Sequence, residues 1–146
     1  MTQILHDFTT EALSQAIEAN QWELFRLLRH WPKVDVHDES EMLWAISNIP
    51  LFFFNSVLRA NLAAEAVDPA IQSVISRGQA RNVPRGWYIG PTTVPADLGA
   101  QLEVNNFTLA AREAGMAVDL QSMNDNLPAP WDLLIDVVEN AQSLQT

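Results

Sequence analysis

The stretch from Val83 to Leu120, VPRGWYIGPTTVPADLGAQLEVNNFTLAAREAGMAVDL, decides the fold. Its apolar run Trp87–Ile89 stops at Gly90-Pro91, which predicts a short buried strand. Thr93 is a candidate N-cap, and an asparagine of Asn105-Asn106 can adopt the left-handed conformation that ends a helix. The pattern therefore predicts a helix between these two points.

Two further strands are predicted at the end of the same stretch. Phe107, Leu109 and Ala111 alternate with more polar residues, as expected of a half-buried strand. Residues 116–120 alternate in the same way, and Glu113-Ala114-Gly115 lies between the two runs as a turn. The whole unit is predicted to be a strand, a helix and a hairpin.

This unit resembles the C-terminal part of the acetyltransferase fold of the GNAT superfamily. The residues that carry the resemblance are Gly90-Pro91, Asp97-Leu98-Gly99, Leu102-Glu103, Phe107 and Met116 to Leu120. Asn106 stands where the family usually has a glycine, and both residue types tolerate the left-handed conformation. The resemblance implies an α+β fold (α/β by some conventions), with a mixed, mostly antiparallel sheet flanked by helices.

The segment from Met42 to Leu62 resembles the N-terminal region of longer, two-part members of this superfamily. In active members a loop patterned Gln/Arg-x-x-Gly-x-Gly/Ala precedes a helix and holds the pyrophosphate of acetyl-coenzyme A. Here Asp68-Pro69 predicts the helix start, and the residues before it, 63–67, contain no glycine and no base. Glu65 and Asp68 would repel the pyrophosphate. The resemblance thus implies acetyl-CoA for the family, and we expect no cofactor to bind this chain.

Length and composition bound the remaining possibilities. The chain has 146 residues, of which 48% are hydrophobic, enough for one domain with a sizeable core. Its formal charge of −10 argues against nucleic acid or an anionic membrane as the main partner. There is no cysteine, so thiolate chemistry is excluded. The first residues lack the basic start and apolar run of a signal peptide, which favours a cytoplasmic protein.

The flanking regions predict further elements. Apolar residues at helical spacing from Thr9 to Trp31 predict two consecutive helices or one bent helix, because Asn20 interrupts the pattern. We expect a GNAT-like N-terminal domain over residues 1–127. Residues 128–146 are expected to be a linker and an extra strand that leads to a second half missing from this chain. The remaining strands are predicted at Val34 to Asp38, Met42 to Ser47, Val57 to Leu62 and Trp131 to Val138.

Few residues suggest chemistry. Arg59, Arg81 and Arg85 are able to line an anionic pocket, and Trp44 and Trp87 an apolar one, although each is more often a surface base or a core aromatic. The candidate substrate-binding residues are Trp44, Asn55, Arg59, Arg85 and Trp87. No catalytic or metal-binding residue is predicted, and the acids at Asp35, Asp38, Glu39 and Glu41 are interpreted as a solvated loop. Tyr88 is expected to pack in the core.

Two main functional hypotheses remain open, and a third is a functioning acetyltransferase with an unusual cofactor site around Arg81, Arg85 and Gly90. In the first, the chain is the N-terminal, non-cofactor half of a GNAT acetyltransferase, shapes the acceptor-substrate side and meets a C-terminal catalytic domain. In the second, it is a stand-alone binding or dimerisation module without catalytic activity. The aromatic segment Leu51 to Phe54 or the strand at Trp131 to Val138 would then form the contact. Under the first hypothesis, Leu51 to Phe54 lie on the acceptor-substrate side. A purely structural alternative for this segment is that its side chains only fill the bottom of the core.

Overall fold

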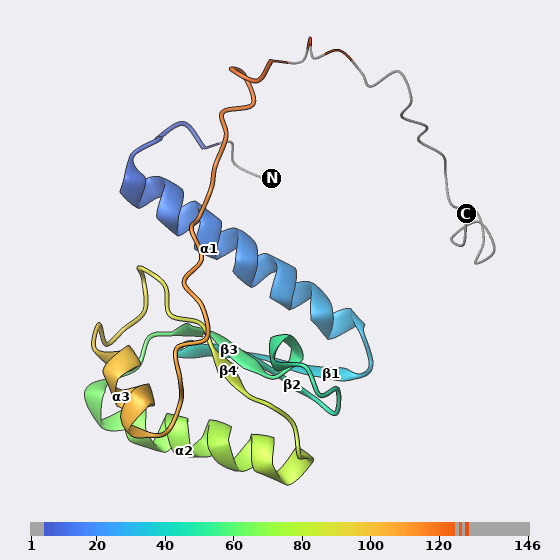
Figure 1. Ribbon diagram of the computed structural model, residues 1–146, viewed down its shortest axis with the longest axis vertical. Coiled ribbons are helices and arrows are strands. Elements are labelled where there is room, and N and C mark those ends of the chain that lie inside the picture. Colours follow the sequence, from blue (N-terminus) through green and yellow to red (C-terminus); the bar gives the residue numbers. More distant parts are fainter. Residues whose placement is uncertain (1–4, 125, 127, 129–146) are drawn as a thin grey trace, which may run out of the picture.

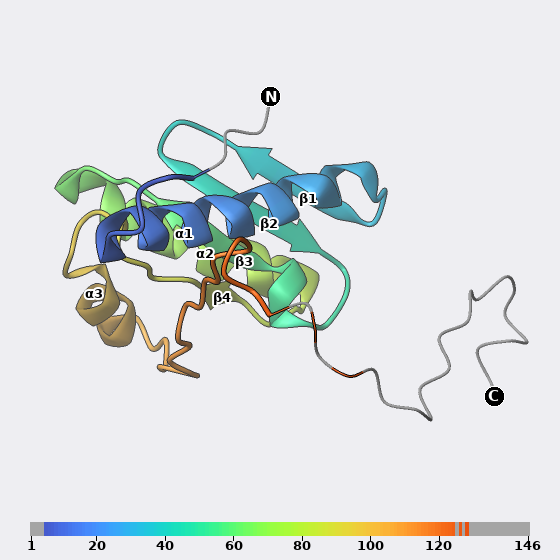
Figure 2. The ribbon, with the colours of Figure 1, turned by 90° about the horizontal axis from the view of Figure 1, so that it is seen from above.

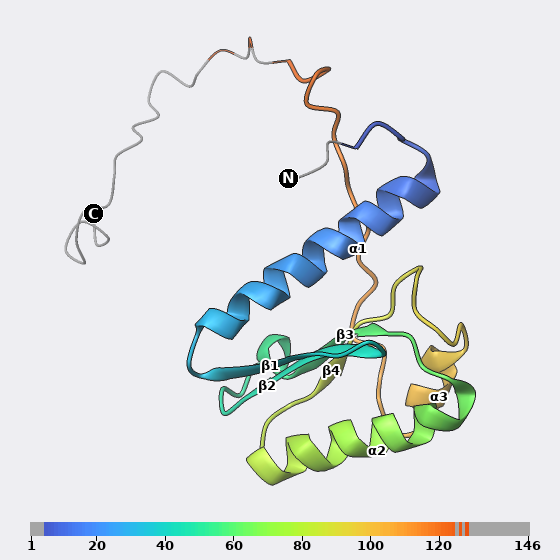
Figure 3. The same ribbon diagram turned by 180° about the vertical axis from the view of Figure 1, so that it is seen from behind.

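The computed structural model describes residues 5–124, 126 and 128, and it has three layers (Figure 1). A four-stranded mixed sheet forms the middle layer, with α1 on one face and α2 and α3 on the other (Figures 1 and 3). This arrangement confirms the expected α+β fold class. In chain order the elements are α1 (Thr10–Leu27), η1 (Leu28–His30), β1 (Val34–Asp38), β2 (Met42–Ser47), η2 (Phe52–Phe54), β3 (Ser56–Ala60), α2 (Ala64–Arg81), β4 (Gly86–Trp87) and α3 (Leu98–Val104).

The sheet has the strand order β1-β2-β3-β4. Strands β1 and β2 are antiparallel, as are β2 and β3, whereas β4 is parallel to β3. The β3–β4 pairing covers only Ser56 with Gly86 and Val57 with Trp87, and an isolated bridge joins Asn61 to Val94 farther along. Three of the four strands thus lie where the sequence predicts them, and β4 is shorter than the predicted Trp87–Ile89 run.

Strand β2 is buried on both faces, and alternate residues feed two separate cores. Trp44 and Ile46 belong to the core on the side of α2 and α3. Leu43 and Ala45 belong to the core on the side of α1, where they join Phe25. Because every residue of β2 is buried, this strand anchors both layers of helices to the sheet.

Helix α1 is one continuous α-helix that continues into the short 3-10 turn η1 (Figures 1 and 2). The Thr9 hydroxyl accepts a hydrogen bond from the Ala12 amide at 3.3 Å, which makes Thr9 the N-cap. The predicted interruption at Asn20 is wrong. Asn20 is exposed, so a mid-helix asparagine costs only its modest helix propensity.

Helix α2 begins at Ala64, five residues before Pro69, so the predicted start at Asp68-Pro69 is also wrong. Pro69 removes one backbone hydrogen bond, the one its missing N–H would give to the carbonyl of Glu65. The extra turn is held because Val67 is fully buried in the core beneath α2. Burial of that side chain offsets the lost bond.

Helix α3 begins at Leu98, later than the Thr93 N-cap predicts. The Thr93 hydroxyl instead accepts a hydrogen bond from the Gly90 amide at 3.0 Å. The predicted end is confirmed, because Asn106 has a φ of 64° and the Phe107 amide donates to the Leu102 carbonyl.

The predicted hairpin over 107–111 and 116–120 is wrong. Both runs lie outside any helix or strand, and the chain leaves α3 and crosses α1, where Gly115 approaches Ile17 (Figures 1 and 3). Phe107 packs on the core, but Leu109, Met116, Val118 and Leu120 are exposed. Residue alternation alone does not make a strand when the described part of the sheet offers these residues no partner. The strand predicted at Trp131 to Val138 lies outside the described residues.

The aromatic segment after β2 divides into two parts. Phe53 and Phe54 pack against the core on the α1 side, so half of the segment does plug the core. Leu51 and Phe52 remain 56% and 54% exposed. Within the described residues no helix is both long enough and apolar enough to span a bilayer.

Candidate functional site

A surface hollow of about 380 Å³ lies between the first two strands and the C-terminal half of α2. Strands β1 and β2, the turn between them and the last turns of α2 all contribute lining residues. Its lining combines aromatic, cationic and anionic side chains: His37, Glu39, Trp44, Ile46, Arg77, Ala80 and Arg81. This mixture distinguishes the hollow from the apolar cores beside it.

Strand register brings His37 and Trp44 together on the α2 side. The two residues are direct partners in the β1–β2 pairing, so their side chains leave the sheet on the same face. Their rings are parallel within 3° and have centroids 3.9 Å apart. The guanidinium carbon of Arg77 lies 4.0 Å from the centre of the Trp44 ring, within the range of a cation–π contact. Trp44 therefore positions both an imidazole and a guanidinium at the hollow.

Two of the three formal charges at the rim have no partner among the described residues. Arg81 is neutralised by Asp35, whose carboxylate oxygen lies 2.7 Å from its nitrogen. The guanidinium of Arg77 makes neither an ion pair nor a hydrogen bond to any described residue. The same holds for the Glu39 carboxylate, although its backbone carbonyl accepts from Arg59. Both side chains are exposed, so a solute can reach them.

A second, smaller cavity of about 20 Å³ adjoins the hollow and shares Trp44, Ile46 and Arg77 with it. That volume holds about one water molecule. Three of the residues predicted to bind substrate, Trp44, Asn55 and Arg85, line it. These three residues therefore lie close together, but the cavity itself is too small for an organic ligand.

Asn55 has a structural role in the connection between β2 and β3. Its amide oxygen accepts from the backbone nitrogen of Ser47 at 2.8 Å and from the Ser47 hydroxyl at 3.2 Å. Its amide nitrogen donates to the carbonyls of Ile49 and Leu51 at 2.7 and 2.8 Å. With both ends of the amide engaged inside the protein, Asn55 holds the loop together.

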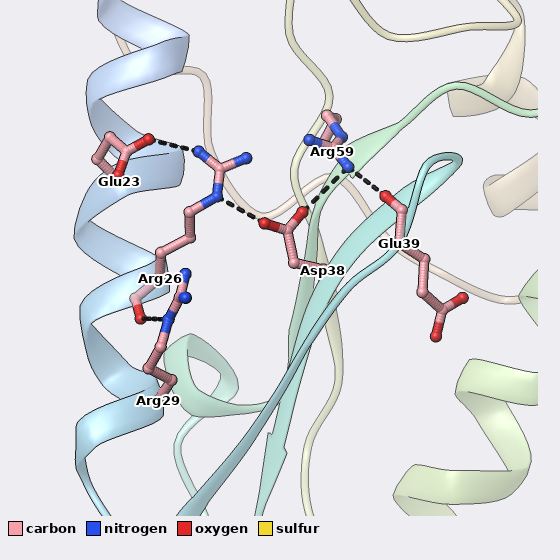
Figure 4. Close-up of polar contacts among 6 residues, drawn as sticks. All are labelled: Glu23, Arg26, Arg29, Asp38, Glu39 and Arg59. Atoms are coloured by element: carbon pink, nitrogen blue, oxygen red, sulfur yellow. Dashed lines mark hydrogen bonds and ion pairs between the residues drawn. The ribbon is translucent and has the colours of Figure 1, made fainter.

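Arg59 lies on the opposite face of the sheet, in a polar network that docks α1 (Figure 4). Asp38 accepts from Arg26 of α1 at 2.7 Å and from Arg59 of β3 at 3.2 Å, and Arg26 also pairs with Glu23 at 2.6 Å. The hydrogen bond from Arg26 lowers the pKa of the Asp38 carboxyl below its usual value, and Asp38 in turn raises the pKa of Arg26. The interpretation of the four acids as a solvated loop is therefore wrong for Asp35 and Asp38, which lie in β1 and are both paired, whereas Glu39 and Glu41 do lie in the turn between β1 and β2.

Arg85 and Trp87 both contact Phe107. The guanidinium of Arg85 lies 5.7 Å from the Phe107 ring, and Trp87 meets the same ring edge-on at 6.5 Å. The indole nitrogen of Trp87 is buried without a hydrogen-bond partner among the described residues. Beside it, Tyr88 is partly buried near Phe25, and this burial raises the pKa of its hydroxyl. Both aromatics serve as packing residues, as was expected of Tyr88.

The connection between β3 and α2 is short, and two of its amides are already engaged. The Asn61 amide donates to the Glu41 carbonyl at 2.8 Å, and the Leu62 amide donates to the Val94 carbonyl at 3.0 Å. Ala63, at the N-cap position, makes no side-chain cap. Glu65 and Asp68 are exposed in the first turns that follow. No group of three or more acids and histidines in the described part of the chain is arranged to hold a metal ion.

Sequence reasoning missed His37, Glu39 and Arg77 as site residues. A usable signal exists for Arg77 and Arg81, which are four residues apart and so share one face of a helix. Comparisons of the chain with protein-family models, curated proteins and solved structures found no match. The functional argument therefore depends on the geometry of the hollow and of the β3–α2 connection.

Proposed function

We propose that the chain is the N-terminal, non-cofactor half of a GNAT-type acetyltransferase and that it contributes to the acceptor-substrate side. The observation that carries this proposal is the β3–α2 connection. In active members of the superfamily, the corresponding loop and helix N-terminus use backbone N–H groups to hold the cofactor pyrophosphate. Here the amides of Asn61 and Leu62 are satisfied by protein carbonyls.

The charges that follow the β3–α2 connection also support the proposal. Glu65 and Asp68 place two carboxylates in the first turns of α2, where an anionic ligand would otherwise be favoured by the helix dipole. A pyrophosphate there would face like charges and would find no base in residues 61–68. The strand, connection and helix thus keep the order of the family's cofactor-binding unit without its anion-binding chemistry.

Calorimetric titration with acetyl-CoA and, separately, with coenzyme A tests this proposal. We expect no binding heat at ligand concentrations near about 1 mM, which corresponds to an affinity weaker than about −4 kcal/mol. An active enzyme of the superfamily, run in parallel, is the positive control. Micromolar binding, or acetyl transfer by this chain above a heat-killed control, would overturn the assignment.

A second candidate, a dimerisation module, is favoured by the exposed half of the aromatic segment. Leu51 and Phe52 are exposed, and Trp31 contacts the neighbouring Phe54 with ring centroids 5.2 Å apart. Exposed large apolar side chains of this kind mark contact surfaces. Light scattering at about 100 µM protein distinguishes the candidates, because micromolar dimers are fully formed at that concentration. A monomer there would exclude this second candidate.

A further inference from the structure

Two opposite charges share the hollow between β1, β2 and α2 without neutralising each other. Glu39 and Arg77 both line it, yet they form no ion pair within 4.0 Å. Figure 4 shows the Glu39 carboxylate pointing away from the Asp38–Arg59 network. Each charge is therefore open to a ligand group of the opposite sign.

The cationic side is held in position before any ligand arrives. Contact with the Trp44 ring at 4.0 Å restricts the Arg77 side chain, and Trp44 is itself fixed by the His37 stack and by the core. All five N–H donors of this guanidinium lack partners among the described residues, and their fork geometry suits a carboxylate. Restricting such a long side chain in advance lowers the entropy that binding must otherwise cost.

The anionic side of the hollow, Glu39, is held by backbone hydrogen bonds in the turn between β1 and β2. The Glu39 amide donates to the Met42 carbonyl at 2.9 Å, and the Glu39 carbonyl accepts from Arg59. These two bonds fix the main chain of Glu39 while its side chain makes no bond to a described residue. A carboxylate on a fixed backbone at the rim of a hollow is suited to an ammonium group.

We propose that this hollow binds a small zwitterion that carries an ammonium and a carboxylate, of the class of free α-amino acids. Its carboxylate pairs with Arg77 and its ammonium with Glu39. The volume of about 380 Å³ lies within the range of small-molecule sites and leaves room for a side chain against Ala80 and Ile46. Arg81, which also lines the hollow, remains paired with Asp35.

This site is separate from the connection that carries the acetyltransferase proposal. Ala63 precedes α2, and Arg77 lies 14 residues further along, so at 1.5 Å per residue the two are about 20 Å apart. Binding of an amino acid at the hollow and absence of coenzyme A binding at the connection are therefore measured independently. Failure of either proposal leaves the other standing.

Ligand-observed NMR on the whole chain, with the standard amino acids in small groups at about 5 mM each, tests the proposal. We expect at least one of them to bind with a Kd in the low millimolar range or tighter. The N-acetyl derivative of that amino acid lacks the ammonium, and its α-amide lacks the carboxylate. Both derivatives should bind about tenfold more weakly, because each leaves one charge at the rim of the hollow without its partner.

Two variants separate binding from folding. Arg77→Gln should weaken binding about tenfold, and Glu39→Gln should do the same without affecting the fold, since its side chain has no partner to lose. The matched control is Arg112→Gln. Arg112 is an exposed arginine in the segment that approaches Ile17 of α1, on the other side of the sheet. This control should leave the affinity unchanged.

Several outcomes overturn the proposal. The first is that no amino acid binds at about 5 mM. The second is that the N-acetyl or α-amide derivative binds as tightly as the free amino acid, which would mean a site for a single charge. The third is that Glu39→Gln leaves the affinity unchanged. Any loss of affinity in Arg77→Gln is attributed to the hollow only if its melting temperature matches that of the wild type.

Discussion

Replacing Gly90 by alanine should destabilise the protein through one side chain, that of Glu18. Glu18 of α1 is only 9% exposed, and its carboxylate accepts a hydrogen bond from the Thr92 amide at 3.2 Å. A Cβ added at Gly90 would lie 1.9 Å from Glu18 Oε1 and 2.8 Å from its Cδ. Because atoms cannot approach so closely, the carboxylate must leave its site.

The size of the effect follows from what the displaced carboxylate loses. A hydrogen bond to a charged group contributes about 1.5–3 kcal/mol, and the Thr92 amide is then left without its partner. The alanine itself recovers about 0.4–1 kcal/mol by restricting the unfolded chain, since the φ of Gly90 is not positive. We therefore expect Gly90→Ala to lower the free energy of unfolding by about 1–2 kcal/mol.

Urea unfolding followed by far-UV circular dichroism checks this value, and a double-mutant cycle checks its cause. The three atoms nearest the new Cβ all belong to Glu18, so in a Glu18→Ala background Gly90→Ala should be neutral or slightly stabilising. Gly99→Ala is the matched control, because its Cβ would meet only Ile89, at 3.4 Å. A coupling energy below about 0.5 kcal/mol between positions 18 and 90 would refute the reasoning.

Two further predictions concern polar groups. Asp38→Asn should cost about 0.5–1 kcal/mol at pH 7, a discounted value because the Asp38 side chain is 34% exposed. Its pKa is lowered by Arg26, so this stability is present above the usual value near 3.8 and disappears as the pH falls below it. The gap between the urea midpoints of wild type and variant should narrow as the pH falls below about 3.8, and a gap that stays constant would contradict the assignment. Asn55→Ala should cost about 2–4 kcal/mol, because it removes the acceptor of the buried Ser47 amide. Thermal unfolding measures this, and a cost below about 0.5 kcal/mol would show that the loop closes without Asn55.

Local sequence signals predicted the elements whose cause is local. Asn105-Asn106 ends α3 because a positive φ at Asn106 is tolerable for asparagine. Thr9 begins α1 because its hydroxyl reaches the Ala12 amide three residues away. In both cases the residues that decide the structure are within one helical turn of one another.

The errors arose where the deciding partner is distant in sequence. Residues 107–120 alternate like strands, but a strand also needs a neighbour, and the described sheet ends at the two-residue strand β4. Asp68-Pro69 predicts the start of α2 because proline favours the first turn. Burial of Val67 beneath the helix, which depends on tertiary packing, outweighs that preference.

The candidate site could be predicted in part, because some of its geometry follows from local signals and the rest depends on contacts between residues distant in sequence. Once Glu39-Ser40-Glu41 is recognised as the turn between β1 and β2, pairing of Asp38 with Leu43 puts His37 opposite Trp44. The four-residue spacing of Arg77 and Arg81 likewise places both on one face of a helix. What the sequence does not contain is the position of that helix face over β1 and β2. Trp44 supplies this link, because its ring is buried in the core beneath α2 while contacting both His37 and Arg77. One aromatic side chain thus joins a strand pair and a helix into a single hollow.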